Sequence, residues 1–173
     1  MRWTAVDAEK FFRSKEYVDT VLIPVMPVSF QENCIDHAGE SEYLHLVSAG
    51  LEKQFQGRVL LMPPLIYCAS RDNCIIHVLL HWTEVLETEF FQHICFLTVE
   101  KIPQQLITDK RVKVLPVPAI PMHQLDRHNQ KIMINEQIDQ LSRLLKKFWM
   151  AGEKDGPVMS MNRTVDSYIT NET

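Results

Sequence analysis

The run TVLIPVMP at residues 20–27 decides the fold of this chain. Its apolar and β-branched residues follow one another without polar alternation, which is typical of a strand buried on both faces in a parallel sheet. Three similar runs also carry proline near their C-terminal ends: RVLLMPP at 58–64, ICFLTVEKIP at 94–103 and VKVLPVPAIP at 112–121. Proline lacks a backbone N–H and stops strand pairing, so we expect four strands to end along one edge of a sheet.

Helical patterns lie between and around these runs. Apolar residues recur at helical spacing in residues 43–55, 75–90 and 134–148, and a short helix is expected within residues 4–14. Residues 31–40 are polar and predict a loop. Strands that alternate with helices over short connections require parallel pairing and right-handed crossovers. The sequence therefore predicts an α/β fold, a three-layer sandwich with a mostly parallel sheet of about four strands and Rossmann-like or flavodoxin-like topology.

Length and composition indicate one globular domain. The chain has 173 residues, of which 46% are hydrophobic, and this is enough to bury a core without disulfides or metals. We expect a single domain at 1–151 and a polar C-terminal tail at 152–173, where the apolar periodicity stops. The longest helix, before this tail, is the element that the periodicity predicts most clearly.

Charge and cysteine spacing limit the classes of partner and compartment. Lysine and arginine number 18 against 22 aspartate and glutamate, which argues against a nucleic-acid-binding face. The sequence contains no uninterrupted run of about 18 apolar residues, so it predicts no membrane span. The four cysteines form no CxxC pair, which indicates a reducing compartment. We expect a cytoplasmic protein.

A ligand site is predicted at the edge where the strands end, because open α/β sheets hold ligands there. The loop at 29–33 contains no glycine, so its side chains would block the backbone approach that a phosphate loop needs. An ordinary connecting loop is the alternative. The sequence predicts no cofactor and leaves open whether the protein is an enzyme. The candidate ligand-binding residues are Ser29, Gln31, Glu32, Tyr67, Cys74, Thr98 and Glu100.

A histidine pair and a cysteine are further candidates for reactive residues. His77 and His81 stand four apart and could ligate a metal from one helix face, but Val78 takes the place of the glutamate of a metalloprotease helix. Without an assignable third ligand, the sequence predicts no metal site. Cys74 lies near a predicted helix start, three residues from Arg71, and is the best nucleophile candidate. The alternative is that Cys74 only packs.

The end of the last helix carries the aromatic run Phe148-Trp149-Met150. If exposed, this run would form an apolar surface for a protein partner or a second copy of the chain. The alternative is that the aromatic rings fold back on the core.

Three stretches resemble one family of proteins. RWTAVDAEKFF at 2–12, EYVDTVLIPVMPVSF at 16–30 and QGRVLLMPP at 56–64 are similar to the YpiF-like family, uncharacterised proteins of spore-forming bacteria with a domain of unknown function. The resemblance spans roughly residues 1–150 and brings no catalytic residues with it. It implies a cytosolic bacterial protein. Because family members tend to be encoded near components of the menaquinol–cytochrome c reductase, it also implies a link to a respiratory complex.

Two functional hypotheses follow from these observations. The first is a non-catalytic cytosolic accessory or interaction protein, linked to a respiratory complex, which uses the last helix and the tail to bind a protein partner or form a homodimer. The alternative is a small-molecule-binding protein or enzyme with its site at the C-terminal edge of the sheet.

Overall fold

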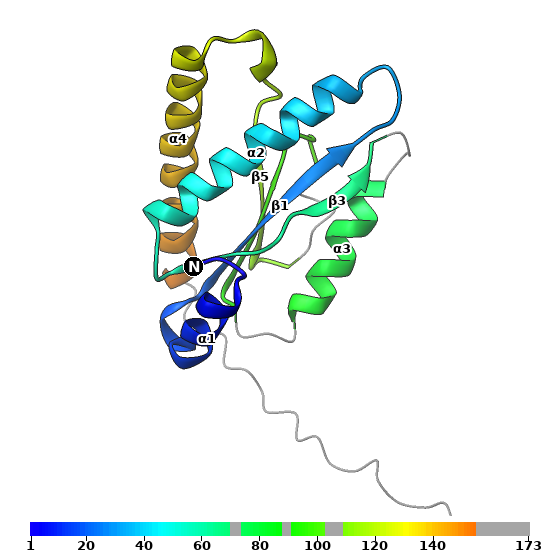
Figure 1. The fold of residues 1–173 in the computed structure, drawn as a ribbon. Coiled ribbons are helices and arrows are strands. Elements are labelled where there is room, and N and C mark those ends of the chain that lie inside the picture. Colours follow the sequence, from blue (N-terminus) through cyan, green and yellow to red (C-terminus); the bar gives the residue numbers. More distant parts are fainter. Residues whose placement is uncertain (70–73, 88–90, 103–108, 155–173) are drawn as a thin grey trace, which may run out of the picture.

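The computed structural model describes residues 1–69, 74–87, 91–102 and 109–154. These residues form a parallel sheet covered by helices on both faces (Figure 1). No helix in these ranges is long and apolar enough to cross a membrane. The elements in chain order are α1 (Ala5–Arg13), η1 (Lys15–Tyr17), β1 (Thr20–Val28), α2 (Cys34–Gln54), β2 (Val59–Leu61), β3 (Leu65–Cys68), α3 (Cys74–Glu87), β4 (His93–Thr98), β5 (Val112–Pro116), η3 (Met122–Gln124) and α4 (Arg127–Lys154).

Strand β1 is the centre of the sheet. The strand order is β2-β1-β4-β5, and β3 pairs with β1 further along the edge that β2 occupies. Every pairing is parallel, with Leu22 of β1 opposite Leu61 on one side and Cys95 on the other. Because β1 is enclosed between strands and helices, all but the last of its nine residues are buried.

The prolines of β1 do not end the strand, and their positions explain why. The carbonyl groups of Leu22 and Val28 accept hydrogen bonds from Met62 and Ala69, so even-numbered residues of β1 face the β2–β3 edge. Pro24 therefore directs its missing N–H toward the gap between β2 and β3, which contains residues 63–64, both proline. The expectation that proline stops this strand is wrong: β1 continues to Val28, because on this edge Pro24 lies between the residues that pair with β2 and those that pair with β3.

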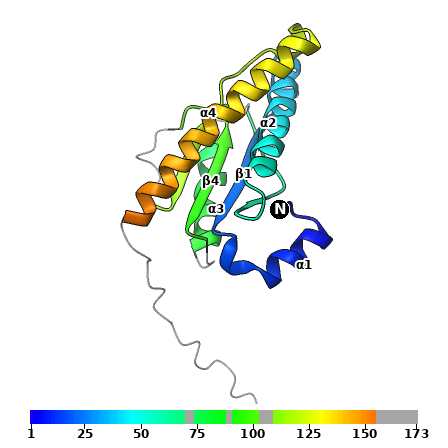
Figure 2. The same ribbon diagram turned by 90° about the vertical axis from the view of Figure 1, so that its left-hand side faces the viewer.

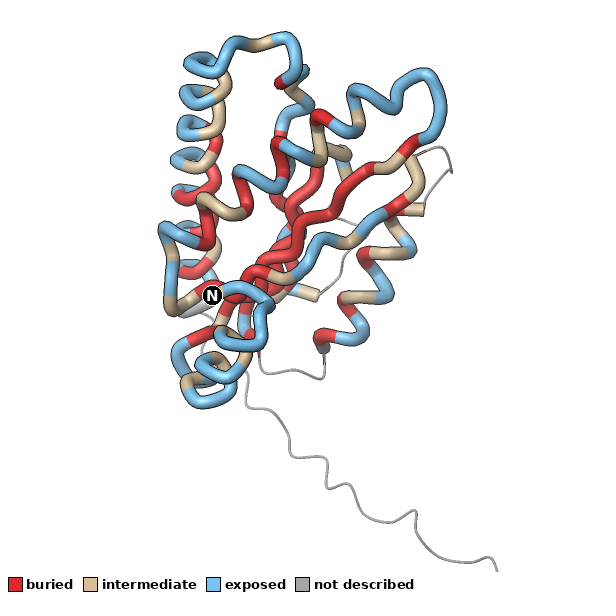
Figure 3. Tube along the Cα trace, viewed as in Figure 1, coloured by how far each residue is buried: buried red, intermediate tan, exposed pale blue. Residues whose placement is uncertain are grey.

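The helices form two layers on opposite faces of the sheet (Figures 1 and 2). Helices α2 and α4 pack against one face, with Leu22, Leu44 and Leu141 among the buried residues of that core. Helix α3 packs on the other face, where Ile23 and Leu79 are buried. Burial is concentrated along the central strands, as Figure 3 shows. The predicted three-layer α/β fold with a mostly parallel sheet is confirmed.

Three local predictions differ from the structure. The sheet has five strands rather than about four, because the chain resumes pairing in β3 after the two prolines. Residues 34–40, predicted as loop, form the first two turns of α2. Helix α4 continues to Lys154, three residues into the predicted tail. Residues 155–173, the rest of the predicted tail, lie outside the described residues.

The aromatic end of α4 is anchored to the start of β1. Trp149 is only 5% exposed, and its indole N–H donates a 2.9 Å hydrogen bond to Oγ1 of Thr20. The guanidinium of Arg58 lies 4.1 Å from the Trp149 ring centre and also pairs with Asp19. Trp149 therefore folds back on the core, and only Met150 of the predicted aromatic surface is exposed.

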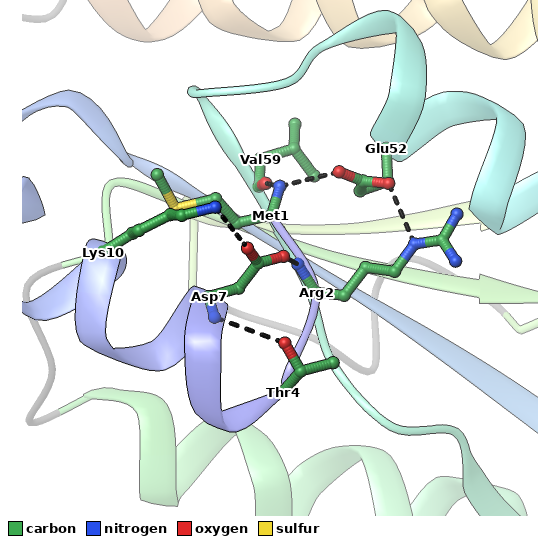
Figure 4. Close-up of polar contacts among 7 residues, drawn as sticks. All are labelled: Met1, Arg2, Thr4, Asp7, Lys10, Glu52 and Val59. Carbon is green, nitrogen blue, oxygen red and sulfur yellow. Dashed lines mark hydrogen bonds and ion pairs between the residues drawn. The ribbon is translucent and has the colours of Figure 1, made fainter.

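Glu52 forms a buried anchor for the first residues of the chain (Figure 4). Glu52 lies on the last turn of α2 and is only 3% exposed. Its carboxylate accepts a 2.8 Å hydrogen bond from the Met1 amine and a 3.1 Å bond from Nε of Arg2. The same amine also donates to the Val59 carbonyl at 2.9 Å. This anchor joins the segment before α1 to α2 and β2.

We predict that Glu52→Gln lowers the free energy of unfolding by about 2 kcal/mol, because hydrogen bonds to charged groups in buried surroundings contribute that much. The matched control is Glu9→Gln, which removes an exposed carboxylate paired with Arg13 and should cost no more than about 0.5 kcal/mol. Urea unfolding followed by circular dichroism measures both. Equal losses in the two variants would contradict the anchoring role of Glu52.

Candidate functional site

The order of the strands puts a topological switch point at the carboxyl ends of β1 and β4. From β1 the chain passes through α2 to β2, which lies on the side of β1 away from β4. From β4 it continues to β5, which lies on the side of β4 away from β1. Adjacent strands whose connections run in opposite directions define a topological switch point, the usual ligand position in open α/β sheets. The segments that follow β1 and β4 therefore carry the candidate site.

A continuous chain of side-chain hydrogen bonds runs from the end of β1 along the first turns of α2. The hydroxyl of Ser29 donates to Oδ1 of Asn33 at 2.8 Å. Nδ2 of Asn33 lies 2.9 Å from Nε2 of His37, and Nδ1 of His37 lies 2.8 Å from Oε2 of Glu40. Ser29 is only 6% exposed, and its oxygen accepts a bond from the backbone N–H of Gln31. The spacing of Asn33, His37 and Glu40 at the start of α2 puts these three side chains on one face, and Ser29 joins the row through its hydrogen bond to Asn33.

A second polar group comes from β3 and from the end of β4. The hydroxyl of Tyr67 donates to Oε1 of Glu100 at 3.2 Å, and the backbone N–H of Glu100 donates to Oγ1 of Thr98 at 3.1 Å. Burial raises the pKa of the Tyr67 phenol well above its usual range, and the negative charges of Glu100 and Glu40 raise it further. The contribution of Glu40 couples this group electrostatically to the hydrogen-bond chain on α2.

Two hollows open at this edge. The larger, about 530 Å³, is lined by Gln31, Glu32 and Asn33. The smaller, about 220 Å³, lies between α2 and the segment after β5 and is lined by Asp36, Glu40 and residues 119–121. Both are open to solvent, and each is bordered by a member of the hydrogen-bond chain.

The structure brings most of the predicted ligand residues to one edge. Ser29, Gln31 and Glu32 follow β1, and Gln31 and Glu32 line the larger hollow. Tyr67, Thr98 and Glu100 form the second polar group. Cys74 is the first residue of α3 and is partly buried, close enough to Tyr67 for its charge to raise the pKa of that phenol.

The histidine pair does not take part in the site. His77 and His81 are both exposed on α3. Among the residues that the structure describes, no group of three or more His, Cys, Asp or Glu side chains could hold a metal ion. The best nucleophile candidate, Cys74, has its proposed activating neighbour Arg71 outside the described residues.

Sequence reasoning missed His37 and Glu40 as members of the site. Both lie in the segment predicted as a loop, where helical spacing was not considered. The signal was present, because Asn33, His37 and Glu40 recur at steps of four and three residues, which place side chains on one face of a helix.

The comparisons with known proteins place the chain in a family. The family model "Protein of unknown function (DUF2487)" matches residues 9–149, so the chain belongs to that family. The chain is also 28% identical over 149 residues to "Uncharacterized protein YpiF" of Bacillus subtilis (strain 168), covering 86% of this chain and 98% of that protein. The predicted YpiF-like resemblance is confirmed. No solved structure matches the chain.

We predict that Tyr67 stays protonated in the folded protein up to about pH 11, because its pKa is raised by burial and by the Glu100 charge. The pKa of Tyr67 is higher in the folded protein than in the unfolded chain, where it is about 10. The protonated phenol therefore contributes its full share of the folding free energy below about pH 10, and this contribution decreases as the pH rises further. The absorbance change at 295 nm should therefore be the same for wild type and Tyr67→Phe below about pH 11. If Tyr67→Phe showed an absorbance change smaller by one tyrosine than wild type below that pH, the buried environment of Tyr67 would be contradicted.

Proposed function

We propose that this protein binds a small polar molecule at the C-terminal edge of its sheet, in the crevice between β1 and β4. One observation carries the proposal. Two hydrogen-bonded groups, Ser29–Asn33–His37–Glu40 and Tyr67–Glu100–Thr98, lie at the ends of strands that meet at the switch point. Polar side chains held by one another at such a crevice are the usual basis of a ligand site.

The arrangement favours binding over nucleophilic catalysis. A nucleophile–base pair requires the nucleophile to donate directly to the base. Asn33 stands between Ser29 and His37, so the serine hydroxyl donates to an amide oxygen and the imidazole is occupied by the amide nitrogen. The group therefore orients side chains toward a ligand without activating the serine.

The chemistry of the edge favours a ligand that donates hydrogen bonds. Glu32 faces the larger hollow and Glu40 the smaller, and Glu100 accepts from Tyr67. In the described part of the chain, no lysine or arginine pairs with Glu40 or Glu100. A ligand with an amine or several hydroxyl groups would supply further donors to these carboxylates.

A second candidate is a cytoplasmic interaction protein, linked to a respiratory complex, that binds a protein partner or a second copy of itself. The observation that favours it is the exposed apolar surface around α1. No residue of α1 is buried, and the large side chains of Trp3, Phe12 and Tyr17 are mostly exposed. Exposed aromatic residues are common at protein interfaces. The burial of Trp149 removes the aromatic surface at the end of α4 from this argument.

We predict that a library of small polar fragments, screened by ¹H–¹⁵N NMR, shifts the amide signals of residues 29–40 and 98–100. Asn33→Ala should weaken the binding of each hit at least about tenfold, because it breaks the hydrogen-bond chain in the middle. The matched control is Asn135→Ala, at an exposed position of α4 away from the crevice, and should leave affinity unchanged. Hits that map only to α1 would favour the interaction protein, and an unaffected edge would contradict the proposal.

A further inference from the structure

In the hydrogen-bond chain from Ser29 to Glu40, all donors point the same way along the chain, and the protonation of His37 determines which way. Ser29 donates to Oδ1 of Asn33, which leaves Nδ2 of Asn33 to donate to Nε2 of His37. Nε2 can accept only if it carries no proton, so the ring proton must be on Nδ1 and donated to Glu40. Each donor in the chain thus faces an acceptor, and only this tautomer of neutral His37 allows that arrangement.

A second proton on the ring makes this direction impossible. Nε2 would then carry a hydrogen and face Nδ2 of Asn33 across 2.9 Å, so two donors would oppose each other. A half turn of the Asn33 amide about its soft terminal torsion removes the conflict. Oδ1 then accepts from Nε2–H, and Nδ2 donates to the Ser29 oxygen. The only atom added is the proton, which comes from water, and Glu40 becomes the partner of an imidazolium.

The Asn33 amide is placed to make this turn. Asn33 is the residue before the first turn of α2, where asparagine side chains usually accept a hydrogen bond from the helix backbone. Its side chain makes no such bond here. The residue is exposed and lines the larger hollow, so no packed neighbour fixes the amide plane. Among the residues that the structure describes, its side chain hydrogen-bonds with Ser29 and His37.

We propose that His37 is a pH-sensitive positioning residue which, on protonation, reverses the hydrogen-bond chain and changes what Asn33 presents to the larger hollow. In the neutral state Ser29 donates to Asn33; in the protonated state it accepts from Asn33. The reversal itself does not depend on any ligand. Its effect on a ligand rests on the proposed function.

Glu40 is the titratable group in contact with His37, and further titratable groups lie near Glu40 or on neighbouring elements. Asp36 and Glu40 belong to its own helix. Tyr67 and Glu100 come from the edge of the sheet, and Glu40 is close enough to Tyr67 to raise the pKa of its phenol. On η3, Nδ1 of His123 lies 3.6 Å from where a side-chain carbon at Gly39 would stand. Protonation of His37 therefore gives Glu40 an imidazolium as its partner.

The test is an NMR titration of the ¹⁵N-labelled full chain from about pH 8 to about pH 5, the range in which histidine changes charge. At the upper end, the ring nitrogen shifts should identify the Nδ1–H tautomer of His37. On acidification, the side-chain amide signals of Asn33 and the backbone amide of Gln31 should shift with the midpoint of His37. The Nε2–H tautomer at high pH, or Asn33 signals that stay constant while His37 titrates, would overturn the proposal.

Two variants separate this role from general effects of pH. His37→Gln should abolish the titration of the Asn33 amide. His45→Gln, at an exposed position of the same helix, should leave it unchanged. The tautomer measurement needs no variant, so it decides the proposal even if His37→Gln fails to fold.

The same titration can be extended to fragments that bind the edge. Their affinity should differ about threefold to tenfold between the two ends of the pH range, because one hydrogen bond changes direction. Reversal without any fragment binding would refute the ligand site and leave the role of His37 intact. Binding without reversal would refute the role of His37 and leave the ligand site intact.

Discussion

The structure depends on the burial of β1 between two parallel neighbours and two layers of helices. A strand with partners on both edges must place every backbone N–H and C=O against another chain segment. β1 meets this requirement with β4 along one edge and with β2 and β3 along the other, and it puts its missing donor at Pro24 where the other edge is interrupted. This interruption forces the chain through residues 63–64 and delivers β3, with Tyr67, to the end of the sheet.

The site follows from the same arrangement. β1 and β4 lie side by side but send the chain to opposite sides, so their carboxyl ends form a topological switch point, the usual ligand position in open α/β sheets. The first turns of α2 lie near this end of the sheet (Figure 1). They carry His37 and Glu40, and Asn33 directly precedes them. The opposite end of the sheet is closed, because Trp149 bonds to Thr20 and Glu52 holds the first residues of the chain. One end of the sheet is thus held by the buried Trp149 and Glu52 contacts, and the other end carries the polar hydrogen-bond chain.

The sequence predicted the fold well because its strands are continuous apolar runs and its helices have regular apolar stripes. It failed where local signals conflicted with tertiary packing. The proline pair at 63–64 correctly marked the end of β2, but β3, which pairs with β1 directly afterwards, was not predicted. The first turns of α2 carry no apolar stripe, because they extend beyond the core, so they read as a loop. Residues near strand ends, such as Ser29 and Glu100, could be predicted as site members from topology alone. His37 could not, because its role depends on a helix that the apolar pattern does not reveal.

The central claim is that the crevice at the ends of β1 and β4 holds a small molecule. Native mass spectrometry of the purified, untagged protein tests it most directly, because one spectrum reports both the number of chains and any retained ligand. We expect a mass above that of the 20.2 kDa chain by the mass of a small molecule, and we expect Asn33→Ala to lose this excess while Asn135→Ala keeps it. A dimer or monomer at the bare mass of the chain, in wild type and both variants, would contradict the claim, and a bare dimer would favour the interaction protein.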